Sequence, residues 1–182
     1  MANIFLILLF TKPIIYQVNM TYTKTSDPNI RECVESWQNL DVDEQLALFW
    51  FIYAEMGDSI TPAAPEASTV SPQIAEGLCH QVKKLNHEQQ LQVQRDLINK
   101  ADTQICREYG SLSDTTKLLF WYRLAQEMES GRVIPLPGGY ELSSAAQRLL
   151  DKIKELPFEQ QINAFRDYVS PMGAEPKAGA EI

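Results

Sequence analysis

An internal repeat constrains the fold of this 182-residue chain more than any other feature. The segment "LNHEQQLQVQRDLI" (85–98) aligns with "LPFEQQINAFRDYV" (156–169) at an offset of 71 residues. The same offset places one "FW" pair (49–50) on another (120–121). Because a single shift aligns two separate segments, the chain is most simply two copies of one structural unit.

The two copies, residues 41–100 and 112–171, are both predicted to be helical. In the first copy Ile74, Leu78 and Val82 recur with a period of about 3.6 residues, which is typical of an amphipathic helix. No segment shows sustained two-residue alternation, so no sheet is predicted. The sequence therefore predicts an all-α fold of two pseudo-symmetric helical bundles.

Local signals divide each copy into helices. Asp41 with Glu44 three residues later forms an acidic cap pattern before the first aromatic run, and "SLSDTTK" (111–117) precedes the second. A proline-rich break follows each aromatic run, "ITPAAPEAS" (60–68) in the first copy and "VIPLPGGY" (133–140) in the second. Each aromatic segment is therefore expected to be a helix of its own.

The two ends of the chain differ from the rest. Residues 1–19 contain an apolar run that lacks a preceding positive charge and is shorter than the roughly 20 residues of a membrane span. We interpret them as an extension upstream of a start at Met20. Residues 174–182 are small and polar, which predicts a disordered tail. The folded domain is accordingly expected to cover residues 20–173.

Charge and cysteine content narrow the function class. A net charge of −8 argues against binding to nucleic acid or to an anionic membrane. Cys33, Cys79 and Cys106 form no CxxC pair, which favours free thiols in a reducing cytoplasm. His80 and His87 are separated by a helix break, so no metal site is expected, and no catalytic motif occurs. The chain is therefore predicted to be a non-enzymatic protein with no membrane span.

The run "LALFWFIYA" (46–54) is apolar on every face of a helix. Two explanations remain open. The aromatic residues either join the two bundles as ordinary core, or they line a ligand site at the bundle boundary, where Trp50, Tyr53, Trp121 and Tyr122 face one another.

Several motifs resemble one family. "LDVDEQLALFWFIYAEMG", "ADTQICREYG", "VIPLPGGYELS" and "EQQINAFRDYV" occur in the order and spacing of the carotenoid-binding N-terminal domain of the cyanobacterial orange carotenoid protein. The resemblance covers about residues 22–173. It implies two four-helix bundles with a tunnel between them for one keto-carotenoid (canthaxanthin, echinenone or a hydroxylated form). It also implies a photoprotective role through quenching of singlet oxygen.

Matched position by position, the resemblance assigns the carotenoid contacts to both aromatic helices, the Pro-Gly loop and the last helix. Trp50 and Trp121 are expected to flank an end ring. Arg166 matches an arginine that takes part in docking to the phycobilisome, the light-harvesting antenna. The expected contacts are Leu46, Phe49, Trp50, Tyr53, Leu118, Trp121, Tyr122, Met128, Leu136, Tyr140, Ile162 and Val169.

The chain also departs from the family pattern. Gln94 replaces a tunnel-lining Met, Leu119 and Ala125 replace Gly, Leu112 replaces a Trp, and "SDT" (113–115) replaces a Ser-Pro-Asn loop. The larger groups at 119 and 125 are expected to narrow or redirect the tunnel, and the changed loop argues against phycobilisome docking.

The two-domain relatives carry a sheet domain after a linker, and the resemblance without a match to that domain predicts a stand-alone helical carotenoid protein. It is expected to be monomeric, to lie in the cytoplasm near the thylakoid membrane, and to receive pigment from a separate donor protein that resembles the missing domain. Alternative roles are a pigment carrier and a quencher that docks to the phycobilisome. A third, from another class, is an interaction module without pigment.

Overall fold

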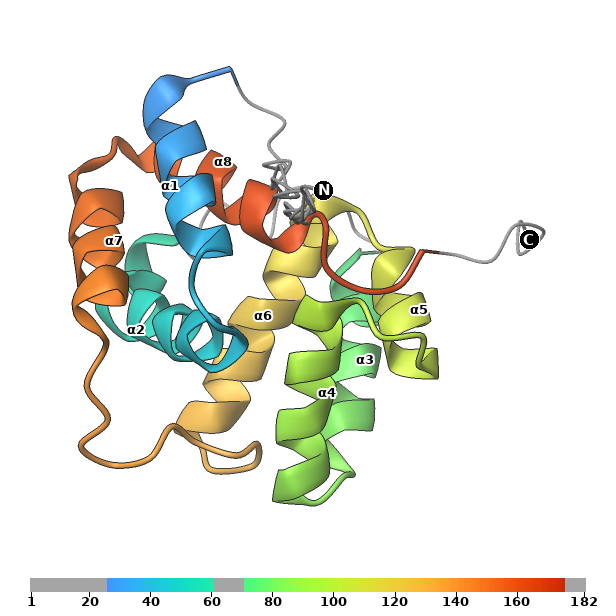
Figure 1. Cartoon of the computed structure of the whole chain (residues 1–182). Coiled ribbons are helices and arrows are strands. Elements are labelled where there is room, and N and C mark those ends of the chain that lie inside the picture. Colours follow the sequence, from blue (N-terminus) through green and yellow to red (C-terminus); the bar gives the residue numbers. More distant parts are fainter. Residues whose placement is uncertain (1–25, 61–70, 176–182) are drawn as a thin grey trace, which may run out of the picture.

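The computed structural model describes residues 26–60 and 71–175, and every regular element in these ranges is a helix (Figure 1). The expected all-α fold is therefore confirmed. The residues 1–19 extension and nearly all of the expected break at 60–68 lie outside the described ranges. The helices are α1 (Pro28–Gln38), α2 (Val42–Ile60), α3 (Ser71–Lys83), α4 (His87–Asn99), α5 (Gln104–Gly110), α6 (Asp114–Glu129), α7 (Ser144–Glu155) and α8 (Phe158–Val169).

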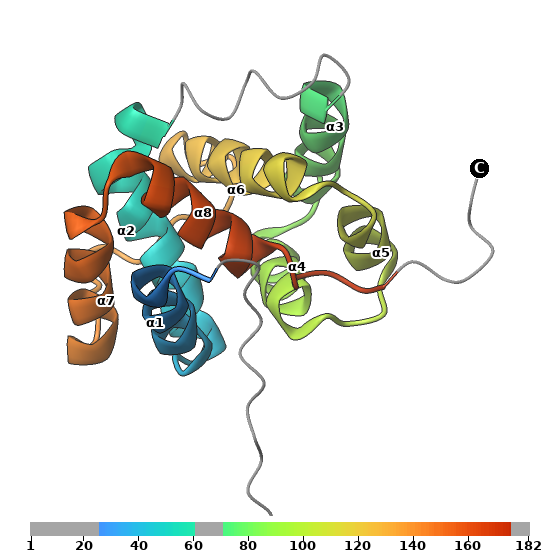
Figure 2. The same ribbon diagram turned by 90° about the horizontal axis from the view of Figure 1, so that it is seen from above.

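The helices form two four-helix groups, one of α1, α2, α7 and α8 and the other of α3, α4, α5 and α6 (Figures 1 and 2). Each group combines helices from both sequence copies. The packing within the two groups is pseudo-symmetric. Helix α3 packs on α6 in one group, and α7 packs on α2 in the other. In the same way, α5 packs on α4 and α1 packs on α8. The contacts across the boundary between the two groups are also symmetric, because α6 contacts α8 and α2 contacts α4. Helices α2 and α6 contact each other across the same boundary. The expected pair of pseudo-symmetric bundles is confirmed.

Capping side chains explain where several helices begin. The Glu44 amide donates to Asp41 Oδ1 at 2.8 Å, as expected for the start of α2. Ser113 caps α6 through the Thr116 amide at 3.3 Å. Each such bond satisfies an amide that has no partner within its helix. The sequence signals for these two helix starts are therefore borne out.

The repeated "EQQ" motif has a structural reason. Gln90 and Gln161 are buried at equivalent positions near the start of α4 and α8. The Nε2 of each donates to the carbonyl five residues earlier, Leu85 at 3.1 Å and Leu156 at 2.9 Å. These bonds satisfy carbonyls at the end of the preceding helix and fix the tight turn between the two helices.

The C-terminal end of the described chain packs back on the other bundle. The Gly173 amide donates to Leu97 O at 2.8 Å, and the Ala174 amide donates to Cys106 O at 3.0 Å. Ala174, the first residue of the expected tail, is therefore buried against the fold, and residues 176–182 of that segment lie outside the described ranges. Within the described ranges, every helix is too short or too polar to span a bilayer.

Candidate functional site

Aromatic side chains of α2 and α6 meet at the boundary between the bundles. Phe49 stacks on Trp121 with ring centroids 4.8 Å apart and planes at 20°. Tyr53 contacts Tyr122 edge-on at 5.6 Å. The "FW" helices of the two copies therefore face each other, as the repeat predicted.

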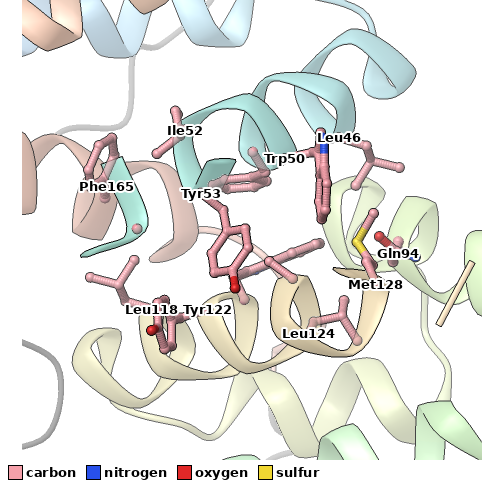
Figure 3. Close-up of a pocket in the computed structure, with 14 residues that line it drawn as sticks. Leu46, Trp50, Ile52, Tyr53, Gln94, Leu118, Tyr122, Leu124, Met128 and Phe165 are labelled. Carbon is pink, nitrogen blue, oxygen red and sulfur yellow. The ribbon is translucent and has the colours of Figure 1, made fainter. Parts of the chain in front are cut away.

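A small cavity of about 50 Å³ lies among these rings (Figure 3). It brings together all the contacts that the sequence assigned to the two aromatic helices: Leu46, Phe49, Trp50, Tyr53, Leu118, Trp121, Tyr122 and Met128. Ala125, expected to narrow the tunnel, also lines this cavity, whereas Leu119 is buried elsewhere.

A second cavity of about 210 Å³ lies beneath the loop that follows α6. Leu136 and Tyr140 line it, as expected for the Pro-Gly loop. Leu46, Gln94 and Met128 line both cavities. Because they share three side chains, the two cavities are neighbours at the boundary between the bundles, and we refer to the pair as the channel.

Other expected site residues lie elsewhere. Ile162 and Val169 are buried in the core and line neither cavity. Arg166 is partly buried, and within the described chain its Nε is buried without a hydrogen-bond partner. Its repeat equivalent, Arg95, instead pairs with Asp43 through bonds of 2.7 and 2.8 Å.

Sequence reasoning missed four residues that line the first cavity. They are Ile52, Gly57, Leu124 and Phe165. The repeat could have indicated Phe165, because it lies 71 residues after Gln94. The other three carry no signal beyond their place on the aromatic helices.

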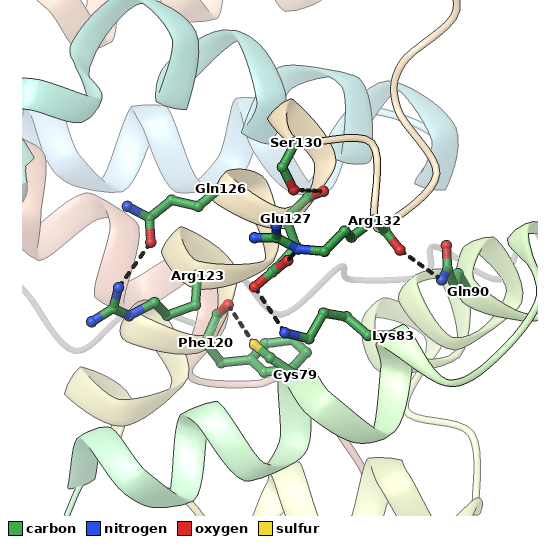
Figure 4. A network of polar contacts seen from close by, with 9 residues as sticks. All are labelled: Cys79, Lys83, Gln90, Phe120, Arg123, Gln126, Glu127, Ser130 and Arg132. Carbon is green, nitrogen blue, oxygen red and sulfur yellow. Dashed lines mark hydrogen bonds and ion pairs between the residues drawn. The ribbon is translucent and has the colours of Figure 1, made fainter.

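A polar network behind α6 holds the loop that covers the second cavity (Figure 4). Glu127 accepts hydrogen bonds from Arg132 and, at 2.9 Å, from Lys83 Nζ of α3. The bond from Arg132, followed by the contact with Lys83, holds the pKa of Glu127 below its ordinary value. Gln90 donates to Arg132 O at 3.2 Å and accepts from the Ile134 amide at 2.7 Å. The start of the loop is therefore tied to both α3 and α4.

Charged groups lie at the mouth of the second cavity. Asp43 and Arg95 line it as an exposed ion pair, and the hydrogen bond from Arg95 lowers the pKa of Asp43. Burial raises the pKa of Tyr140, and the nearby carboxylates, led by Glu44, raise it further. No group of three or more potential metal ligands occurs among the described residues. The arrangement favours binding of an elongated apolar ligand with its end near a polar rim.

A sequence profile described as "Orange carotenoid protein, N-terminal" matches residues 22–175. The chain belongs to this family. The carotenoid-binding family expected from the sequence is therefore confirmed.

Individual relatives agree with this assignment. An orange carotenoid-binding domain-containing protein of Nostoc sp. PCC 7120 is 46% identical over 149 residues, which cover 82% of this chain and 86% of the relative. The orange carotenoid-binding protein of Synechocystis sp. PCC 6803 is 44% identical over 140 residues, which cover 77% of this chain. The match covers only 44% of that relative's length.

One similar solved structure is that of the Red Carotenoid Protein of Anabaena (Nostoc) sp. PCC 7120 binding canthaxanthin. Its sequence identity to this chain is 66%, and the TM-score is 0.73. That match covers 81% of this chain and all of the Red Carotenoid Protein chain. The likeness therefore extends over the whole of that relative's chain and over most of this one.

Proposed function

We propose that this chain binds one keto-carotenoid in the channel between the bundles. The observation that carries the proposal is the apolar, aromatic lining contributed by Leu46, Trp50, Tyr53, Trp121 and Tyr122 at the boundary of the two bundles. A relative that is 66% identical has been solved with canthaxanthin bound, which supports a ligand of this class. Burial of a long polyene against such side chains is favourable by about 25 cal/mol per Å² of apolar surface.

Ligand binding requires the aromatic side chains to move apart. The first cavity, of about 50 Å³, has room for only a few water molecules and is far too small for a carotenoid. The Phe49–Trp121 stack spans the boundary and is the contact that must separate. We expect the pigment-free protein to be a monomer that is more prone to associate than the loaded form, because the opened seam is apolar.

We further propose that the loaded protein protects against light damage by quenching singlet oxygen. The partly exposed rings of Trp50, Tyr53 and Tyr140 leave the channel ends near solvent, where oxygen can approach the polyene. This activity needs contact between oxygen and polyene and no catalytic group. We place the protein in the cytoplasm near the thylakoid membrane and expect a separate donor protein to supply its pigment.

A second candidate role is docking to the phycobilisome as an energy quencher. Arg166, at the position that the family resemblance assigns to docking, is the residue that would carry this role, and it is partly exposed. The altered 113–115 loop argues against it. A pigment carrier remains the third role within this class.

The test begins with protein expressed in a carotenoid-producing host. Broad absorbance between blue and green, with a keto-carotenoid recovered by extraction, is expected, and a colourless protein would instead favour an interaction module. Holoprotein is then mixed separately with a singlet-oxygen sensitiser plus trap, and with phycobilisomes. Loss of trap signal with unchanged phycobilisome fluorescence supports singlet-oxygen quenching. The reverse pattern supports docking, and no effect in either assay supports a carrier.

A further inference from the structure

Gln94 is a buried amide within a channel whose other lining is mainly apolar and aromatic. Its side chain lines both cavities beside Leu46 and Met128, and the residue is 3% exposed (Figure 3). Its Nε2 donates to Gln90 O, one turn earlier in α4, at 3.3 Å. Among the described residues nothing donates to its Oε1. An amide also has a second N–H, so Gln94 offers one acceptor and one donor to a ligand.

An amide oxygen that faces an apolar cavity is stabilised when a ligand supplies the hydrogen bond that the protein does not. Two other polar side chains that line the first cavity are engaged within the protein. Tyr53 donates to Glu129 at 2.8 Å, and Trp121 Nε1 donates to Tyr109 Oη at 2.9 Å. Gln94 therefore differs from these groups in having hydrogen-bonding capacity left for the ligand.

Two pairs of repeat-related residues line the first cavity, and one of these pairs differs in polarity between the two copies. Trp50 on α2 and Trp121 on α6 are repeat equivalents, and both line the first cavity. Gln94 on α4 and Phe165 on α8 are also repeat equivalents that line it. The tryptophan pair is the same in both copies, whereas the second pair is an amide on one side and a phenyl ring on the other. The first cavity thus has a hydrogen-bonding side chain on the α4 side and a phenyl ring on the α8 side.

We propose that Gln94 selects carotenoids whose end ring carries an oxygen and directs that ring to the α4 side of the channel. A ring ketone accepts a hydrogen bond from Nε2, and a ring hydroxyl donates to Oε1. A hydrocarbon ring leaves the amide unpaired, which is expected to weaken binding about tenfold. This inference rests on the proposed function and adds the basis of ligand choice.

The test is competitive loading. Pigment-free wild type, Gln94→Met and Gln92→Met are each incubated with liposomes that contain equal amounts of β-carotene, echinenone and canthaxanthin. The bound pigment is then extracted and separated by chromatography. Gln92 is the matched control, because it makes the same chemical change on the exposed face of α4, where its amide bonds to Asp96.

Wild type and Gln92→Met are expected to favour the ketones over β-carotene about tenfold, and Gln94→Met is expected to lose most of this preference. Equal uptake of all three pigments by wild type, or an unchanged preference in Gln94→Met, would overturn the selection. Both of those results leave carotenoid binding intact. A wild type that takes up no pigment overturns the proposed function as well.

A vibrational measurement on wild type alone covers the case in which Gln94→Met does not fold. Echinenone has one carbonyl, so binding in a single orientation should give one carbonyl stretch, at lower frequency than in an apolar solvent. An unshifted band would show that no hydrogen bond forms and would refute the proposal. Two bands, one shifted and one not, would show that the ring enters at either end and would refute the directing role.

Discussion

Separate replacement of Trp50 and Trp121 with alanine tests whether repeat-related residues have the same role. Trp121 is 6% exposed, stacks on Phe49 and donates from Nε1 to Tyr109 Oη at 2.9 Å. Trp50 is only partly buried and has a looser ring contact, with Tyr53 at 5.8 Å. The structure therefore places Trp121 in the core as well as the channel, and Trp50 mainly at the channel.

Because the two environments differ, the two substitutions should lower the free energy of unfolding by different amounts. Trp121→Ala removes a buried aromatic side chain and should lower the free energy of unfolding by about 3–5 kcal/mol. Tyr109 loses one partner but keeps the bond to Val169 O at 3.4 Å, which limits the extra cost. Trp50→Ala removes a partly exposed side chain and should cost about 1 kcal/mol. At roughly 2–4 °C per kcal/mol for a chain of this size, the melting temperatures should fall by about 10 °C and about 3 °C.

The assay compares urea and thermal unfolding of the pigment-free variants with the pigment each variant binds at a temperature where it is folded. Trp50→Ala should keep near wild-type stability and lose most of its pigment, with a blue shift in what remains. Trp121→Ala should lose both. Equal destabilisation by the two substitutions would contradict the assignment of Trp121 to the core. Full pigment loading of Trp50→Ala would contradict its role at the channel.

Further predictions concern parts of the fold around the channel. The lowered pKa of Glu127 means that its stabilising contribution is complete above its ordinary value of 4.5 and is lost as pH falls through the lowered value. Unfolding titrations between about pH 5 and pH 3 should therefore show a smaller acid effect in Glu127→Gln than in wild type. Gly110→Ala would place a Cβ 1.8 Å from Ala174 O, so it should release the C-terminal segment and increase its proteolysis. Gly77→Ala is the control, because its Cβ meets nothing within 4 Å, and it should raise stability by about 0.5–1 kcal/mol; a destabilised Gly77→Ala would refute this reasoning.

Much of the fold could be predicted because the residues that fix turns between helices recur in both copies of the repeat. Gln90 and Gln161 recur in the sequence since each satisfies a carbonyl at the same helix turn. Asp41 and Ser113 could be recognised as helix starts because capping depends on side chains close to the backbone they satisfy. Such local interactions leave a signal in a single sequence.

The assignment of helices to bundles could not be predicted in the same way. Helix α2 belongs to the first copy but packs on α7 of the second, and α6 packs on α3 of the first. Both this exchanged pairing and pairing within a copy would bury the same apolar stripes and give the same repeat. Only long-range packing distinguishes them, and periodicity does not report it.

The candidate site was predictable where its residues share a helix with the aromatic repeat and less so elsewhere. Ile162 was expected at the channel yet is in the core, whereas Phe165, three residues later, lines the cavity. Residues three apart share one side of a helix, so the small rotation of α8 that decides which of them reaches the channel is not encoded in the apolar pattern.

The structure also explains why the "LALFWFIYA" helix has no polar face. Helix α2 packs on α7 within its bundle and on α4 and α6 across the boundary, so three sides require apolar residues. Aliphatic side chains fill the core, with Leu48 fully buried and Ile52 5% exposed. The partly exposed rings of Trp50 and Tyr53 lie at the boundary instead. Tight packing alone would favour burying such large rings completely, since aromatic side chains stabilise most when they leave water. Their incomplete burial at the first cavity fits a surface whose packing is completed by a flat, apolar ligand.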